Sequence, residues 1–233
     1  MSRNVGGTIY EKKIINSIQK TRIAGNIDNP AGSSNTEPDA DFIVAGIRHL
    51  LEVKQNSKTQ MGGTSLAYDG VNFSTSKAEM FDTRLLRNVI AAAKRKQPAI
   101  DKFLRYIGAD GVPFTCSKET WKEARDQGLL KEVNTKVQTD AEFICRHYRE
   151  KGVNYIQIGG SGLFHLGENP ANLPIPKLQG KVDIEMRLGA GGSKNNNIGA
   201  GFRVQARLKD SVQSKYSFEN PEEINKILEI INE

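Results

Sequence analysis

The sequence predicts an α/β fold with a β-rich C-terminal portion. Residues 8–20 and 140–151 carry apolar side chains at the spacing of amphipathic helices. Residues 181–188 and 202–209 instead alternate apolar and charged side chains, which is the period of half-buried strands. Since no internal repeat and no low-complexity linker divides the chain, the economical interpretation is one domain spanning residues 1–233.

The first predicted element is a helix over residues 8–20. Thr8 and Glu11 have the capping-box pattern at its start, a hydroxyl followed three residues later by a carboxylate. Residues 25–38 are rich in Gly, Asn, Ser and Pro, and are therefore predicted to form a loop.

Two short strands are predicted next, at residues 42–45 and 50–53. Gly46 stands between these apolar runs, as expected for a tight turn that joins paired strands. The polar stretch 56–76 contains three glycines, so we expect a loop there with room for one short strand.

The middle of the chain predicts further helices. An apolar stripe from residue 79 is closed by Pro98, and a second helix follows over residues 98–106. Three residues have the character of N-caps for later helices, including the one at 140–151: Ser117, Thr139 and Asn220.

A period of two dominates the predicted β-rich region, at about residues 153–210. The runs 155–158 and 163–166 form a predicted hairpin across a glycine-rich turn. The two longer alternating strands are joined by residues 189–199, a loop of Gly and Asn with one Lys.

Composition favours a cytoplasmic protein, and its positive charge is compatible with a phosphate-bearing partner. The net charge is +6 and the pI about 9.2, which raises the odds of nucleic-acid binding without deciding it. Cys116 and Cys145 are too few for a disulfide framework, so we expect reduced thiols. Residues 1–7 lack the apolar core of a secretory signal, and no apolar run approaches the roughly 20 residues of a membrane helix.

Acidic residues and a lysine stand at the ends of the first two predicted strands. Glu52 and Lys54 project to one face because they are two residues apart, and Asp41 stands at the mouth of the neighbouring strand. If the strands pair, the carboxylates of Asp41 and Glu52 approach a common point, where a cation offsets their repulsion. Magnesium keeps several waters and needs only one or two carboxylates, and Lys54 can orient such a water.

The segment Pro38-Asp39-Ala40-Asp41, followed by Glu52-Val53-Lys54, resembles the motif of the PD-(D/E)XK nuclease superfamily. The resemblance implies a restriction-endonuclease-like fold, with a mixed central sheet flanked by helices. It implies hydrolysis of DNA phosphodiester bonds with Mg²⁺, which Mn²⁺ can replace, held by Asp41 and Glu52 beside Lys54. Many members also carry an acid on a preceding helix, and Glu11 matches it. The resemblance covers residues 8–54, within a catalytic region that we set at 8–60.

Three alternatives remain open for this motif. Asp39 follows the proline, whereas Asp41 directly precedes the strand; position at the strand's mouth favours Asp41 and leaves Asp39 to bind a water. Glu11 can be a member of its capping box instead of an accessory acid. An acid-x-Lys triplet also arises by chance, so a charged sheet edge without chemistry is the structural alternative.

Basic residues in the β-rich region are the predicted DNA-binding group. Asp183 and Glu185 can neutralise part of this surface, which leaves a solvated, salt-bridged sheet as the alternative. Lys94, Arg95 and Lys96 end a predicted helix, where cations offset the carbonyl dipole, and are interpreted as a helix end. The predicted DNA contacts are Arg187, Arg203, Arg207 and Lys209.

The predicted function is therefore a site-specific DNA endonuclease of restriction or phage type, in the cytoplasm of a bacterial or phage-infected cell. A Holliday-junction resolvase or repair nuclease is the alternative within the same enzyme class. A DNA-binding protein without catalysis is the alternative from another class. Nucleases that cut both strands often dimerise, so a homodimer is a further option, although no stretch of sequence identifies an interface.

Overall fold

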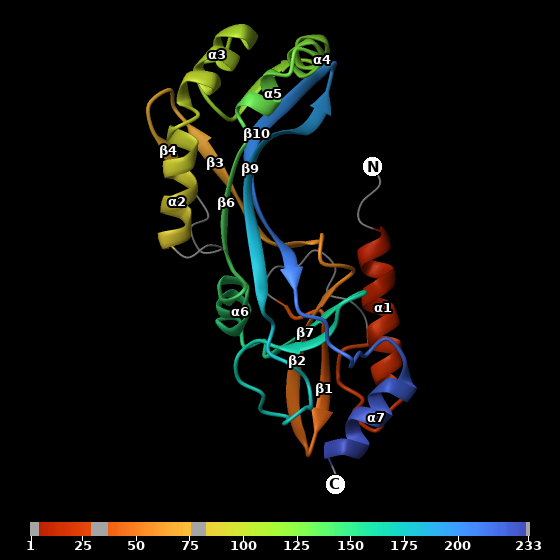
Figure 1. Ribbon diagram of the computed structural model, residues 1–233. Helices are drawn as coiled ribbons and strands as arrows, with labels where there is room; N and C mark the ends of the chain where they lie inside the picture. The colour runs from red at the N-terminus through yellow and green to blue at the C-terminus, as the bar shows by residue number, and fades with distance from the viewer. Residues whose placement is uncertain (1–4, 29–36, 76–82, 232–233) are drawn as a thin grey trace. The chain divides into compact units, whose positions relative to one another are not determined.

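The computed structural model describes residues 5–28, 37–75 and 83–231, and shows a mixed α/β protein, as predicted (Figure 1). The chain divides into two compact units. Unit 1 comprises Met1–Thr59, Asp140–Lys181 and Leu208–Glu233, and unit 2 comprises Gln60–Thr139 and Val182–Arg207. Neither unit is one continuous segment, so the organisation of the chain as a single domain stays a prediction.

The sequence also predicted that the chain has no membrane-spanning helix and that its two cysteines are reduced. None of the helices in the described residues is long and apolar enough to cross a membrane. Cys116 and Cys145 are both free and buried, as predicted.

Unit 1 is built on a four-stranded mixed sheet of order β1-β2-β7-β8. Strands β1 and β2 are antiparallel, β2 and β7 are parallel, and β7 and β8 are antiparallel, which confirms both predicted hairpins. The elements of unit 1 are α1 (Val5–Gln19), β1 (Ala40–Val44), β2 (Ile47–Lys54), α6 (Glu142–Arg149), β7 (Tyr155–Ile158), β8 (Gly162–His165) and α7 (Pro221–Ile231).

A two-residue turn joins β1 to β2 and sets their register. Ala45 and Gly46 both have positive φ, at 52° and 78°, which is the combination that type I′ hairpin turns require. Glycine adopts this conformation without strain, and the turn pairs Val44 with Ile47 and Ala40 with Leu51.

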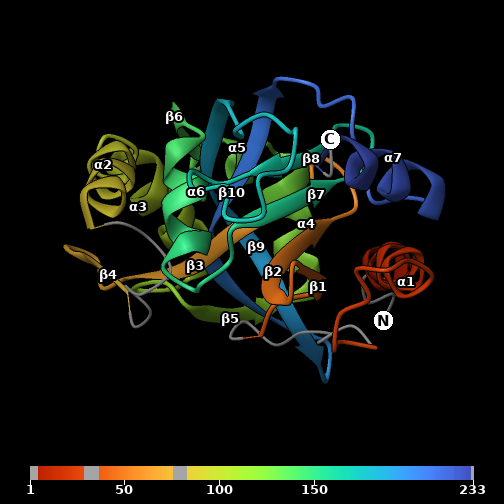
Figure 2. The same cartoon turned by 90° about the horizontal axis from the view of Figure 1, so that it is seen from below.

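Helices α1 and α7 lie side by side in unit 1 (Figure 2). Their apolar faces share one core with the sheet, in which Ile14 and Ile18 of α1 join Phe42, Tyr155 and Phe218. Phe42 contacts both other rings, with centroid distances of 5.2 Å to each.

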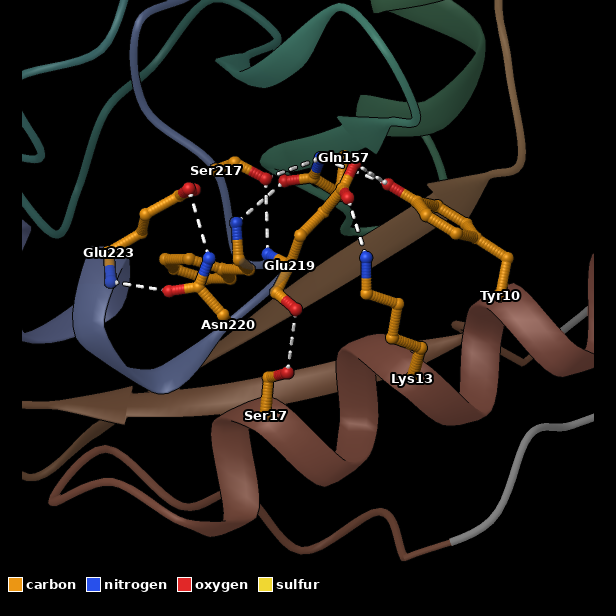
Figure 3. Close-up of polar contacts among 9 residues, drawn as sticks. Tyr10, Lys13, Ser17, Gln157, Ser217, Glu219, Asn220 and Glu223 are labelled. Carbon is orange, nitrogen blue, oxygen red and sulfur yellow. Dashed lines mark hydrogen bonds and ion pairs between the residues drawn. The ribbon is translucent and has the colours of Figure 1, made fainter.

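A buried glutamine ties α1, β7 and the segment before α7 together (Figure 3). The Gln157 side-chain amide donates to the Tyr10 hydroxyl at 3.2 Å, and its carbonyl accepts from the Phe218 amide at 2.9 Å. Tyr10 donates in turn to Glu219, which also pairs with Lys13 at 2.6 Å. Because every member has a partner, this network fixes the position of α1 against the sheet.

The helix caps were only partly predicted. Ser117 and Asn220 cap their helices, accepting from the amides three residues on at 3.0 and 2.9 Å. The capping box at Thr8 is wrong, because α1 begins at Val5 and Thr8 lies inside the helix. Thr139 is also wrong as a cap, since it lies in a strand and Asp140 accepts from the Glu142 amide instead.

Unit 2 is built on a sheet of order β4-β3-β10-β9-β6, with β5 paired to β10. Helices α3, α4 and α5 cluster together, and Phe103, Phe114 and Trp121 meet between them and β5. The elements are β3 (Gln60–Tyr68), β4 (Phe73–Ser74), α2 (Thr83–Lys94), α3 (Gln97–Ile107), β5 (Phe114–Ser117), α4 (Lys118–Asp126), α5 (Leu129–Glu132), β6 (Thr135–Asp140), β9 (Gly180–Lys194) and β10 (Asn197–Ser211); the ends of β6, β9 and β10 belong to unit 1.

Two predicted loops in unit 2 are strands. Residues 60–68 form β3, which pairs with β10 over six residues; Gly62 and Gly63 conceal its alternation in the sequence. Most of the predicted loop 189–199 extends β9 and β10, and the turn is Asn195-Asn196, with φ of 48° and 62°. The predicted helices at 79–97 and 98–106 correspond to α2 and α3, and residues 79–82 lie outside the described residues.

Candidate functional site

The motif side chains meet in unit 1, at the end of the β1–β2 hairpin. Since Ala40 pairs with Leu51, Asp39 stands level with Glu52, and its carboxylate accepts a hydrogen bond of 2.9 Å from the Val53 amide. The Lys54 ammonium lies 3.9 Å from the same Asp39 oxygen and forms an ion pair with Glu52. The side chains of Asp39 and Glu52 are each 11% exposed and that of Lys54 is 16% exposed, so the cluster is largely buried.

Asp41 lies outside this cluster, and the expectation that it converges with Glu52 is wrong. Asp41 pairs with Leu50, which lies two residues before Glu52 along β2. Its fully buried carboxylate accepts from the Asn26 and Ile27 amides, at 3.0 and 2.9 Å, and from Arg48 at 2.5 Å. Although burial alone would raise the pKa of Asp41, these hydrogen bonds hold it below its ordinary value.

Glu11 projects from α1 towards the cluster. Because Thr8 is not a cap, the carboxylate of Glu11 has no capping role to fulfil. One of its oxygens, Oε2, is buried without a hydrogen-bond partner among the described residues. Burial raises the pKa of Glu11; the charge of Lys54 opposes the rise and that of Glu52 adds to it. The structure therefore brings Glu11, Glu52 and Lys54 together, with Asp39 in place of Asp41, and the roles of these side chains stay a prediction.

Tyr148 of α6 also belongs to the cluster, and the sequence analysis missed it. Its hydroxyl hydrogen-bonds Glu52, and the Lys54 ammonium lies 5.8 Å from the centre of its ring. Burial and the negative charges of Glu52 and Asp39 raise the pKa of Tyr148 well above its ordinary value. In the sequence, Tyr148 continues the apolar stripe of Ile144 and Cys145, so periodicity indicates only a core residue.

The cluster holds more negative than positive charge. Burial, followed by repulsion from Glu52, raises the pKa of Asp39 to about 7, against the opposing effect of Lys54. Burial alone would lower the pKa of Lys54, but the charges of Glu52 and Asp39 raise it. Lys54 thus interacts with the carboxylates of Glu11, Asp39 and Glu52, and burial with the charge of Glu52 accounts for the raised pKa of Asp39.

The donor set suits a hard divalent cation. In the part of the chain that the structure describes, no three His, Cys, Asp or Glu side chains are gathered closely enough to enclose a metal. Magnesium does not require such a cage, because one or two carboxylates and several waters suffice. Asp39 and Glu52 could offer the two carboxylates, and Oε2 of Glu11, which has no hydrogen-bond partner among the described residues, could accept from a water on such an ion.

The predicted DNA-binding residues all lie on β9 and β10, and they differ in their bonding partners and in their exposure. Arg187 forms an ion pair with Glu185, and Asp183 is bonded to Lys136 and Gln138, so the expected neutralisation occurs in part. Arg203 donates to the Ala190 carbonyl at 3.0 Å and lines a hollow of about 450 Å³. Arg207 is partly buried and donates to Gln205 at 2.9 Å, whereas Lys209 is exposed and belongs to unit 1.

Comparisons with protein-family models, with curated proteins and with solved structures found no match to this chain.

Proposed function

We propose that this protein is a Mg²⁺-dependent endonuclease of the PD-(D/E)XK type that hydrolyses DNA phosphodiester bonds. The observation that carries the proposal is the meeting of Asp39, Glu52 and Lys54 at the end of one β-hairpin. The motif then reads Pro38-Asp39 and Glu52-Val53-Lys54, with the aspartate directly after the proline.

The topology of unit 1 supports a restriction-endonuclease-like fold. The resemblance implies a mixed sheet flanked by helices, with the motif on a hairpin. Strands β1 and β2 form such a hairpin, and β7 lies parallel to β2 after the helix α6. Helix α1 supplies the upstream acid, Glu11, as the resemblance implies.

Each side chain of the cluster has a role that its surroundings suggest. Asp39 and Glu52 would hold the ion, which when bound polarises a phosphoryl oxygen and lowers the pKa of a water. Lys54, released from Glu52, would orient the attacking water or offset the charge that develops on the phosphate. Glu11 would accept a hydrogen bond from a water in the cluster, and Tyr148 would hold Glu52 in place.

DNA is the proposed substrate, and site-specific cleavage is the proposed form of the activity. The basic character of the chain and the exposed Arg203 and Lys209 support a polyanionic partner. The alternative is a non-catalytic DNA-binding protein, in which Lys54 and Glu52 form only a structural ion pair.

Cleavage of supercoiled plasmid by the purified chain tests the proposal. We expect nicking or linearisation with Mg²⁺ or Mn²⁺, none in EDTA, and binding without cleavage in Ca²⁺, which favours more ligands and looser geometry. Glu52→Gln should abolish cleavage, and Glu229→Gln, an exposed carboxylate on α7, should leave it unchanged. Full activity in EDTA, or equal activity of wild type and Glu52→Gln, contradicts the metal mechanism.

A further inference from the structure

The excess positive charge of the chain lies entirely in unit 2. This unit contains 17 Lys and Arg residues against 11 Asp and Glu, whereas unit 1 contains 16 of each. The net charge of +6 therefore belongs to unit 2, and the unit that carries the motif cluster is formally neutral. Attraction of a polyanion is consequently a property of unit 2.

Within unit 2, helix α2 separates apolar and basic residues onto opposite faces. Leu85, Leu86, Val89, Ala92 and Ala93 are buried. Arg87 and Lys94 are exposed seven residues apart, with the exposed Ala91 between them, and Arg95 is exposed directly after the helix. Positions at this spacing share one side of a helix, so the cations form a stripe about 10 Å long.

The stripe lacks acidic neighbours in its own helix. No Asp or Glu occurs between Thr83 and Ile100, and Arg87, Lys94 and Arg95 make no ion pair with any described residue. Lys94 and Arg95 also offset the dipole at the helix end, but Arg87 lies in the N-terminal half, where the dipole does not favour a cation. Offsetting the dipole at the end of the helix therefore explains Lys94 and Arg95 but not Arg87.

Several other basic side chains of unit 2 lie beside acidic ones, whereas Arg203 and Arg207 of the sheet hydrogen-bond neutral groups. On α4 the exposed Lys118, Lys122 and Arg125 alternate with acids, and Arg125 pairs with Asp126. On the sheet, Lys136 pairs with Asp183 and Arg187 with Glu185. The α2 stripe differs from both, because none of its cations is paired with an acidic side chain among the residues that the structure describes.

We propose that this stripe, Arg87, Lys94 and Arg95, binds the phosphate backbone of duplex DNA. The identity of the polyanion rests on the proposed function; the location rests on the charge distribution. A duplex places one phosphate every 3.4 Å along each strand, so a rigid stripe of about 10 Å can reach more than one. A membrane surface fits less well, because no large apolar side chain of α2 is exposed to anchor in lipid. Such contacts position DNA without reading its sequence.

The test is DNA binding by the full chain in EDTA, so that cleavage plays no part. A labelled duplex of about 30 base pairs is titrated at several salt concentrations with wild type and with the Arg87→Gln, Lys94→Gln, Arg95→Gln triple variant. Each lost contact should lower the slope of log K against log salt by about 0.9, which corresponds to about 8-fold weaker binding at 0.1 M salt. We expect one to three such losses, hence about 8-fold to about 500-fold weaker binding.

Two matched variants separate local contact from net charge. The Lys118→Gln, Lys122→Gln, Arg125→Gln variant removes the same charge from α4 and should change the slope by less than about 0.5. A triple that keeps the charges, Arg87→Lys, Lys94→Arg and Arg95→Lys, should bind as wild type, with thermal melting confirming that all three variants fold. Equal losses in the α2 and α4 variants, or unchanged binding by the α2 variant, overturns the inference.

A competitor identifies the polyanion. Poly-glutamate at equal charge concentration should displace the duplex poorly, and displacement as strong as that by unlabelled duplex overturns the assignment to DNA. A protein that loses binding in the α2 variant but never cleaves plasmid would refute the proposed function and leave this inference standing.

Discussion

The amide of Val53 donates a hydrogen bond of 2.9 Å to the carboxylate of Asp39. This bond fixes the carboxylate 3.9 Å from the ammonium of Lys54, which pairs with Glu52; these two residues flank Val53 along β2. The motif cluster is thus held by the backbone of the hairpin, which positions Asp39 whatever its charge.

The first prediction concerns the two candidate aspartates. Asp39→Asn should abolish Mg²⁺-dependent cleavage while the protein stays folded, because an amide is a poor magnesium ligand but still accepts from the Val53 amide. Asp41→Asn should instead lower stability by about 1–3 kcal/mol, since it weakens a buried carboxylate that accepts three hydrogen bonds.

Plasmid cleavage and thermal unfolding of the two variants separate these effects. At a temperature where both are folded, Asp41→Asn should retain most of the wild-type activity. Loss of cleavage in Asp41→Asn with full activity in Asp39→Asn would return the catalytic role to Asp41.

Apolar patterning predicted the hairpin but not which aspartate its register selects. The runs 42–45 and 50–53 and the turn at Gly46 were sufficient for two paired strands. The choice of Asp39 depends on pairing Ala40 with Leu51, a register fixed by the type I′ turn at Ala45-Gly46. The same apolar pattern also fits a longer turn, which would pair different residues. The pattern alone therefore does not determine the register.

Contacts between segments distant along the chain could not be predicted from sequence patterns, for a different reason. Tyr148 reaches Glu52 across 96 positions of the chain, and periodicity within α6 records only that it is buried. Residues 56–76 were predicted to be a loop with room for one short strand, and the length of β3 was missed because Gly62 and Gly63 conceal its alternation, while pairing with β10 holds it in the sheet. The helix caps at Ser117 and Asn220 were predictable because a cap is a local interaction.

The second prediction is a pH dependence of stability that Asp39 causes. Its folded pKa of about 7 lies above its ordinary value, so the folded state retains a proton that the unfolded state has lost between about pH 4 and pH 7. The free energy of unfolding should therefore fall as the pH rises through this interval, by up to about 4 kcal/mol from this group. Below pH 4 the effect is absent.

Thermal melts of wild type and Asp39→Asn from pH 4 to pH 8 measure this contribution. Asp39→Asn should be the more stable protein at pH 8, and the difference should shrink as the pH falls towards 4. A constant difference across the range means that Asp39 does not titrate there.

The third prediction separates the roles of Glu52 and Lys54. Glu52→Gln should weaken Mg²⁺ binding because it removes a ligand. Lys54→Met should abolish cleavage but preserve or strengthen Mg²⁺ binding, since it removes the cation that now pairs with Glu52. Calorimetric titration at pH 8 distinguishes the two, and equal loss of Mg²⁺ binding in both variants contradicts the role of Lys54.

The fourth prediction concerns Tyr148. Tyr148→Phe removes the hydroxyl that bonds Glu52 and leaves the ring that packs against Lys54. We expect weaker Mg²⁺ binding, by about 10-fold, with cleavage recovering at saturating Mg²⁺, because ligand orientation and not chemistry is disturbed. Tyr106→Phe, an exposed tyrosine in unit 2, is the control. A defect that persists at saturating Mg²⁺ would mean that Tyr148 acts in the chemical step.

The last prediction ranks the arginines of β9 and β10 by their bonding in the structure. Among the described residues, Arg203 and Arg207 hydrogen-bond neutral groups and form no ion pair, although Arg207 is partly buried. Arg187 is paired with Glu185 and must give up that partner before it meets a phosphate. Arg203→Ala and Arg207→Ala should each weaken duplex binding in EDTA and lower the salt slope by about 0.9, whereas Arg187→Ala should change the slope by less than about 0.3. None should alter Mg²⁺ affinity, because the proposed metal ligands Asp39 and Glu52 lie in unit 1. If Arg187→Ala weakens binding as much as Arg203→Ala, the ion pair with Glu185 does not persist when DNA binds, and the ranking fails.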